Sequence, residues 1–150
     1  MLEQQIEQDL KAALLSGDRM KAETLRGIKS ALLYAKVEKG KRETGLSKDE
    51  EIAVLSKESK KRTESAELYL KGGSQEKADA ELKEKEIIDK YLPEQLSETA
   101  LNEIVESAIK ELGATDLSAM GKVIALVKEK TAGAADGGLI AKAVKDKLNQ

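Results

Sequence analysis

Apolar residues recur every three or four positions along almost the whole chain, which is the spacing of one face of an α-helix. The first stripe consists of Leu2, Ile6, Leu10 and Leu14, and the second consists of Leu25, Ile28, Leu32 and Ala35. Gly17 and Asp18 separate the two stripes. The pattern therefore predicts two helices that are joined by a short turn.

A third and a fourth helix are predicted to form a long antiparallel hairpin. After a polar loop from Gly40 to Leu46, the segment Ser47-Lys48-Asp49-Glu50 has the residues of a capping box and starts a helix that reaches Leu70 or Lys71. Gly72-Gly73-Ser74 then ends this helix, because glycine adopts the left-handed conformation, and the Ser74 hydroxyl caps the next one. The fourth helix runs from about Gln75 to Leu92.

Pro93, the only proline of the chain, marks the boundary between two predicted domains, residues 1–93 and 94–150. Proline has no backbone N–H and keeps the preceding residue out of the helical conformation, so the fourth helix is expected to stop near Leu92. Ser97 is a suitable N-cap for a new helix.

The second half contains three further apolar stripes, and we find no strand-like alternation anywhere. The predicted helices run from Glu98 to Leu112, closed by Gly113; from Leu117 to about Thr131, closed by Gly133; and from Gly137 to Leu148, capped by Asp136. Their stripes are Leu101, Ile104, Val105, Ala108 and Leu112; Leu117, Met120, Ile124 and Val127; and Ile140, Ala143, Val144 and Leu148. We predict an all-α protein with an N-terminal four-helix domain and a C-terminal three-helix domain.

The amino-acid composition excludes most common types of catalytic site. The 150 residues include no His and no Cys, so a Cys/His zinc site, a Ser-His-Asp triad or a thiolate nucleophile cannot be built. There is no Phe or Trp to stack on single-stranded bases. We therefore predict no catalytic residues, no cofactor and no metal.

The chain has no apolar run long enough to span a membrane and no secretory signal at its start. We expect a cytoplasmic protein without a membrane partner. The formal net charge is −2, which argues against binding nucleic acid by bulk electrostatics. Residues 94–150 contain no arginine, so a site that needs a planar guanidinium belongs to the first half.

Arg62 is the charged residue with the clearest predicted partner. It follows Ile52, Leu55 and Ser59 on the inward stripe of the third helix, and the fourth helix presents Glu81 and Glu84. Arg62 lies ten residues before Gly72 and Glu84 eleven after Gly73, so the hairpin brings them opposite each other. We favour a structural ion pair of Arg62 with Glu81 and Glu84. The alternative is that Arg62, with Lys60, Lys61 or Arg26, binds a phosphate or carboxylate of a partner.

In the second half, Gly121 is predicted to lie inside a helix, where glycine costs about 1 kcal/mol relative to alanine. We expect another backbone to approach it closely, from a neighbouring helix or a ligand. Lys122 and the Gly133 to Gly138 loop then form the surface most suited to an RNA backbone.

Several of these motifs together resemble the YqeY-like proteins, over essentially the whole chain. They are Leu25-Arg26 with Ile28-Lys29, Lys61-Arg62 with Glu64-Ser65 and Tyr69, Glu81 and Glu84, Ile88 with Tyr91-Leu92-Pro93, and Met120-Gly121-Lys122-Val123 followed by Gly133. YqeY-like proteins are similar to the tail region of the B subunit (GatB) of the tRNA-dependent amidotransferase. The resemblance implies two helical domains and a link to tRNA or to amide transfer, a carbon–nitrogen ligase reaction that uses glutamine as nitrogen donor.

The resemblance implies no catalytic residues in this chain, and the tail region contributes by contacting tRNA. We therefore predict a non-catalytic module that binds tRNA, an amidotransferase or a tRNA synthetase. The predicted binding residues are Arg26, Lys61, Arg62, Gly121, Lys122 and Gly133. Two alternatives stay open: a component of a glutamine-dependent amidotransferase, and a helical protein–protein interaction module.

Overall fold

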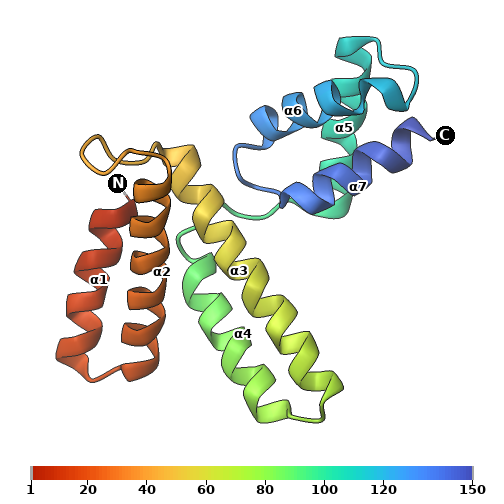
Figure 1. The fold of residues 1–150 in the computed structure, drawn as a ribbon. Helices are drawn as coiled ribbons and strands as arrows, with labels where there is room; N and C mark the ends of the chain where they lie inside the picture. Colours follow the sequence, from red (N-terminus) through yellow and green to blue (C-terminus); the bar gives the residue numbers. More distant parts are fainter. Residues whose placement is uncertain (1, 150) are drawn as a thin grey trace. The chain divides into compact units, whose positions relative to one another are not determined.

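The computed structural model describes residues 2–149, and all regular structure in this range is helical (Figure 1). The elements are α1 (Leu2–Ser16), α2 (Arg19–Glu38), α3 (Lys48–Lys71), α4 (Gln75–Asp89), α5 (Glu98–Leu112), a 3-10 turn (Leu117–Ala119), α6 (Met120–Thr131) and α7 (Gly137–Leu148). The predicted all-α class is confirmed. The chain divides into two compact units, one ending at Leu92 and the other beginning at Pro93. That these units are independent domains stays a prediction.

Side-chain caps fix where several helices begin. At the start of α3, Ser47 Oγ accepts a hydrogen bond from the Glu50 N–H at 3.2 Å, and Glu50 Oε1 accepts one from the Ser47 N–H at 3.1 Å. This is the predicted capping box. Ser97 caps α5 and Asp136 caps α7 through their side chains, as predicted.

Three predicted helix ends are wrong. Ser74 makes no side-chain cap, because its backbone (φ −103°, ψ 82°) departs from the extended conformation that aims the hydroxyl of Ser47 at the helix. Helix α4 ends at Asp89 rather than Leu92, and Leu92 N–H bonds to the Asp89 carbonyl in a tighter turn before Pro93. The left-handed residue that ends α6 is Ala132 (φ 47°), with Gly133 following it.

The core of the first unit lies mainly between α1 and α2. Its buried side chains are Ile6, Leu10, Ala13, Ala22, Leu25, Ile28, Leu32, Ala35, Leu46, Leu55 and Ile88. The prediction for Leu14 is wrong, since its side chain is 50% exposed. Steps of four residues rotate about 40° around a helix with 3.6 residues per turn, so the stripe drifts and Ala13 takes the inward position.

The second unit has a core of its own, formed by α5, α6 and α7. It consists of Leu101, Val105, Ala108, Val123, Val127, Ile140, Val144 and Leu148. The predicted stripe of α6 missed Val123, which is fully buried one turn before Val127, and it included Leu117, which is 45% exposed. Leu117 lies in the 3-10 turn, where the angle per residue differs from that of α6.

Candidate binding site

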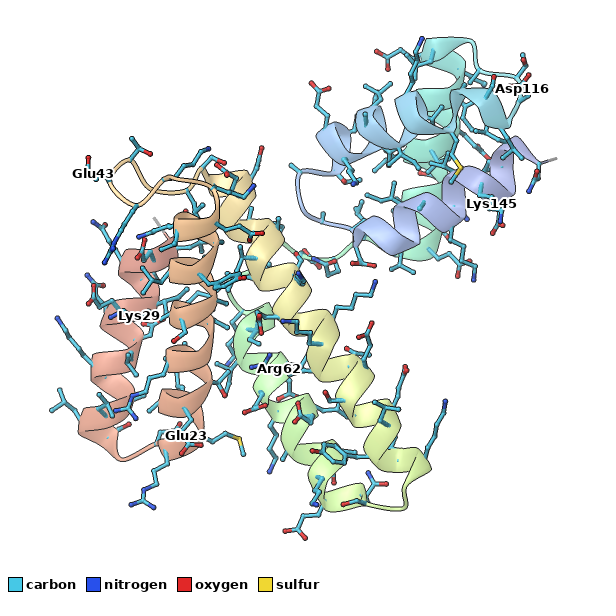
Figure 2. The ribbon with its side chains drawn as sticks, in the orientation of Figure 1. Glu23, Lys29, Glu43, Arg62, Asp116 and Lys145 are labelled. Carbon is cyan, nitrogen blue, oxygen red and sulfur yellow. The ribbon has the colours of Figure 1, made fainter. Side chains whose placement is uncertain are left out.

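Arg62 on α3 lies in a cluster of carboxylates where α3 and α4 face each other (Figure 2). Its Nη1 is 2.6 Å from Glu58 Oε2, and its Nε is 3.6 Å from Glu84 Oε2 on α4. Sequence reasoning missed Glu58, although a spacing of four residues on one helix is the signal that could have found it. The Arg62 side chain is only 18% exposed.

The cluster holds more negative than positive charge. Burial raises the pKa of Glu84, the charge of Glu81 raises it further, the Arg62 guanidinium lowers it, and Glu23 on α2 raises it again. Glu81 thus acts on the neighbouring Glu84 carboxyl, whereas the ion pairs of Arg62 go to Glu58 and Glu84. Arg62 offsets a carboxylate excess that comes from three helices.

Gly27 explains how α2 fits against this cluster. A Cβ at Gly27 would lie 3.7 Å from Arg62 Nη2, so the guanidinium packs on the backbone of α2. The side chain is therefore held by α2, α3 and α4 together. Glu58 and Glu84 would therefore compete with a partner's phosphate for Arg62. The described residues contain no group of three or more His, Cys, Asp or Glu that could hold a metal ion.

The other predicted basic residues of this unit face different surroundings. Arg26 is exposed and, with Arg19, lines a pocket of about 330 Å³ between α1 and α2. Lys61 is also exposed, lies 3.3 Å from Glu58, and lines a groove between α2 and α3. Lys61 and Arg62 are therefore neighbours that share Glu58, whereas Arg26 lines a separate pocket.

In the second unit the predicted residues lie at opposite ends of α6. Gly121 and Lys122 are exposed in its first turn, while Gly133 follows its last turn, about 16 Å away along the helix axis. The expected close approach of a neighbouring helix to Gly121 is wrong: among the described residues, nothing packs within 4 Å of the place its Cβ would take. The alternative that a ligand backbone approaches Gly121 stays a prediction. Gly121 lies on the solvent side of the helix start.

Gly133 is held in place by the segment after Pro93. Gln95 Nε2 donates a hydrogen bond to the Gly133 carbonyl at 3.3 Å, and Leu96 N–H donates one to the Ala134 carbonyl at 2.8 Å. With φ at 90°, Gly133 adopts a conformation that a residue with a side chain rarely takes. These contacts give Gly133 a structural role in closing the second unit.

Glu51 on α3, which sequence reasoning did not single out, is a buried glutamate beside the start of α1. It is 3% exposed, and its Oε2 accepts a hydrogen bond from the Glu3 N–H at 3.1 Å. Oε1 has no hydrogen-bond partner among the described residues. Glu51 thus caps the first turn of α1 from another helix, and no sequence pattern reports such a long-range cap.

The first unit has an open groove between α2 and α3, with a volume of about 810 Å³. We call it the α2–α3 groove. Its apolar lining comes from Ala31 and Ala35 on α2 and from Ala53 and Val54 on α3. Tyr34 also lines it, with 72% of the residue exposed. Sequence reasoning missed this groove, because Tyr34 falls outside the stripe that packs against α1.

Ion pairs close one end of the α2–α3 groove. Glu50 lies 2.6 Å from Lys41 Nζ and 3.4 Å from Lys39 Nζ. The hydrogen bond from Lys41, followed by that from the Ser47 N–H, lowers the pKa of Glu50 to about 2. Lys57 and Lys61 line the groove farther along α3, toward its other end. The groove combines an apolar floor with charged ends.

Comparison with known proteins gives a family match over nearly the whole chain. The model of a family described as Yqey-like protein matches residues 3–148. A search of curated proteins finds no match to the chain. None of the helices in the described range is both long and apolar enough to cross a membrane.

Proposed function

Because the chain belongs to the YqeY-like protein family, we propose that it is a non-catalytic binding module of tRNA-dependent amide transfer whose partner is the amidotransferase or a tRNA synthetase. The α2–α3 groove is the observation that supports this proposal most. It is an open surface of about 810 Å³ with an apolar lining and a tyrosine that is 72% exposed. Exposed apolar surface of this kind is typical of protein interaction sites, and tyrosine is enriched among the residues that dominate binding energy.

The distribution of positive charge favours a protein partner over tRNA in this unit. Arg62 is occupied by two glutamates, and Lys61 lies beside Glu58. Phosphate binding depends on several cations that face the same backbone. Lys61 and Arg62 share Glu58, which offsets their charge, and Arg26 lines a separate pocket, so the three do not form such a row.

A direct binding measurement tests this proposal. Purified protein is titrated with a tRNA-dependent amidotransferase and, separately, with a tRNA synthetase, by isothermal titration calorimetry. We expect one of them to bind, and Tyr34→Glu to remove the binding because it puts a charge on the apolar surface. Leu68→Glu is the matched control, since Leu68 is 68% exposed and lies outside the groove. Binding that survives Tyr34→Glu, or no binding to either enzyme, contradicts the proposal.

Contact with tRNA is a second candidate function, which four lysines of the second unit favour. Lys122, Lys128, Lys142 and Lys145 are exposed, and their side chains make no ion pair within residues 2–149. If they contact tRNA, the affinity falls steeply with salt and Lys122→Glu weakens it. Salt-independent or absent association in a filter-binding assay removes this candidate.

The catalytic alternative is tested with the same protein. Glutamine, ATP and a mischarged tRNA are incubated with it, and released ammonia and amidated product are measured. A non-catalytic module gives no product above the blank. Product that depends on this chain alone would overturn the proposed function.

A further inference from the structure

We propose that the α2–α3 groove binds one amphipathic helix of the partner, about three turns long, acidic at its N-terminal end and basic at its C-terminal end. This inference rests on the proposed function in one respect, that the partner is a protein. The occupant is defined by the shape of the groove, its lining and the charges at its two ends.

The walls of the groove have the length and direction that suit a helix. The contact of Lys39 with Glu50 places the end of α2 beside the start of α3, so the two walls run antiparallel. The lining covers Ser30 to Lys39 on α2 and Asp49 to Lys61 on α3. At 1.5 Å per residue these walls are about 14 and 18 Å long, which corresponds to roughly three helical turns.

The side chains on the floor of the groove are small, and an aromatic side chain lies at its edge. Ala31 and Ala35 lie one turn apart on α2, and Ala53 faces the groove from α3. Side chains of this size allow the backbone of another helix to come close, as in helix-in-groove recognition. Tyr34 stands beside them and offers the large contact area that anchors such a helix.

Helix α2 carries a second apolar stripe that the described residues cover only in part. Its first stripe, with Leu25, Ile28 and Leu32, is buried in the core. On the outer side, Leu33 is 48%, Tyr34 72% and Val37 57% exposed. A helix that is apolar on two sides is typically covered on both. The α2–α3 groove opens beside this outer stripe.

Unpaired charges of opposite sign mark the two ends of the groove. Glu38 and Asp49 lie at the end that Lys39 and Glu50 close, and Lys57 lies toward the other. Within residues 2–149, Glu38, Asp49 and Lys57 make no ion pair. A helix with acidic residues in its first turn and basic residues in its last turn complements both ends when it runs parallel to α2. A groove with both positive and negative charges does not suit a nucleic-acid backbone, because that backbone is uniformly negative.

A display library of peptides about 12 residues long, enough for about three helical turns, provides the probe. It is selected against the full-length protein, with all positions randomised. We expect enriched sequences to share small or aliphatic residues at helical spacing, acidic residues in the first turn and basic residues in the last. Tyr34→Ala should weaken the binding of an enriched peptide by about tenfold or more, because tyrosine at such a site commonly contributes over 1.4 kcal/mol. Leu68→Ala, another exposed apolar position, should leave it unchanged.

An exchange of charges tests the direction of the bound helix. The double variant Glu38→Lys/Lys57→Glu keeps the net charge and alters no ion pair of the described residues. Against this variant the selection should enrich peptides with the reverse order of charges. The inference is overturned if both proteins select the same order, if enriched sequences lack helical spacing, or if Tyr34→Ala disrupts a dimer of this chain or tRNA binding instead.

The outcomes separate this inference from the proposed function. A selected helix that binds through Tyr34, together with no binding of either enzyme, refutes only the proposed function. Enzyme binding that Tyr34→Glu abolishes but an enriched peptide cannot displace refutes only the helix in the groove.

Discussion

The two hairpins of the first unit have the same topology and different interiors. Between α1 and α2 the buried residues are large aliphatics, among them Ile6, Leu25 and Ile28. The α3–α4 hairpin has large buried residues, Leu55 and Ile88, only at its open end, where they join the common core. Toward the turn its buried positions are small, Ala66 and Ala78, and Arg62 with its glutamates lies between these two parts (Figure 2). The first hairpin is held by burial, and the second by close packing and by pairs that fix its register.

Polar contacts also connect α3 and α4 at the open end of the second hairpin, away from the Gly72-Gly73 turn. Ser59 Oγ donates a hydrogen bond to Asp89 Oδ1 at 2.5 Å, and Lys85 Nζ lies 2.5 Å from Asp89 Oδ2. Tyr91 Oη, just beyond α4, donates to Asp9 Oδ2 on α1. The α3–α4 hairpin is thus specified by directional contacts, whereas apolar packing alone tolerates substitutions of similar volume.

Ile28→Ala should produce the largest loss of stability. Ile28 is fully buried, and removing such a side chain leaves a cavity that costs about 2 to 5 kcal/mol. Urea unfolding followed by circular dichroism measures the difference, with Leu33→Ala on the exposed side of α2 as the control. A loss below about 1 kcal/mol would show that burial does not dominate the first hairpin.

Ala78→Leu tests the second hairpin by enlarging a buried side chain instead of truncating one. Ala78 is fully buried against α3, so added methylenes force the helices apart and cost about 1 to 3 kcal/mol. Ala80→Leu, at an exposed position of the same helix, should be nearly neutral. If Ala78→Leu stabilises the protein in urea unfolding, the close approach of α3 and α4 is not what holds this hairpin.

Ser47→Ala and Ser74→Ala compare the starts of the two helices of this hairpin. Ser47 caps α3, and loss of such a cap costs about 1 kcal/mol. Ser74 precedes α4 without a side-chain cap, so its replacement should stay within about 0.5 kcal/mol. Equal losses in the two variants would contradict this difference.

The comparison also shows what the sequence predicts well. The spacing of apolar residues and the capping residues predicted all seven helices of the described range. The nearly equal distances of Arg62 and Glu84 from Gly72 and Gly73 predicted that these two residues lie opposite each other. The interior of α3–α4 was harder, since Glu58 and Gly27 matter through contacts that no stripe records. The α2–α3 groove could not be predicted, because it depends on how two helices diverge rather than on the residues of either.

The pH dependence of stability should give the smallest effects, with opposite signs for Glu50 and Glu84. In the folded protein the pKa of Glu50 is lowered to about 2, from an ordinary value of 4.5. Its contribution to stability is therefore complete above the ordinary value and is lost as the pH falls toward 2. Glu50→Gln should be less stable than the native sequence at neutral pH, and this difference should shrink in acid.

Glu84 lies in the carboxylate excess of the second hairpin, and burial followed by the charge of Glu81 raises its pKa. Between its ordinary and its raised value the folded state binds more protons than the unfolded state, so stability falls as the pH rises through that window. Glu84→Gln removes this fall and should be at least as stable as the native sequence at neutral pH, despite the lost pair with Arg62. Urea midpoints from about pH 3 to 7 test both signs, because the linkage slope is set by the difference in bound protons. If Glu84→Gln loses stability relative to the native sequence with rising pH, as Glu50→Gln does, the pair with Arg62 outweighs burial and Glu81, and the second hairpin depends on its charges for strength as well as for register.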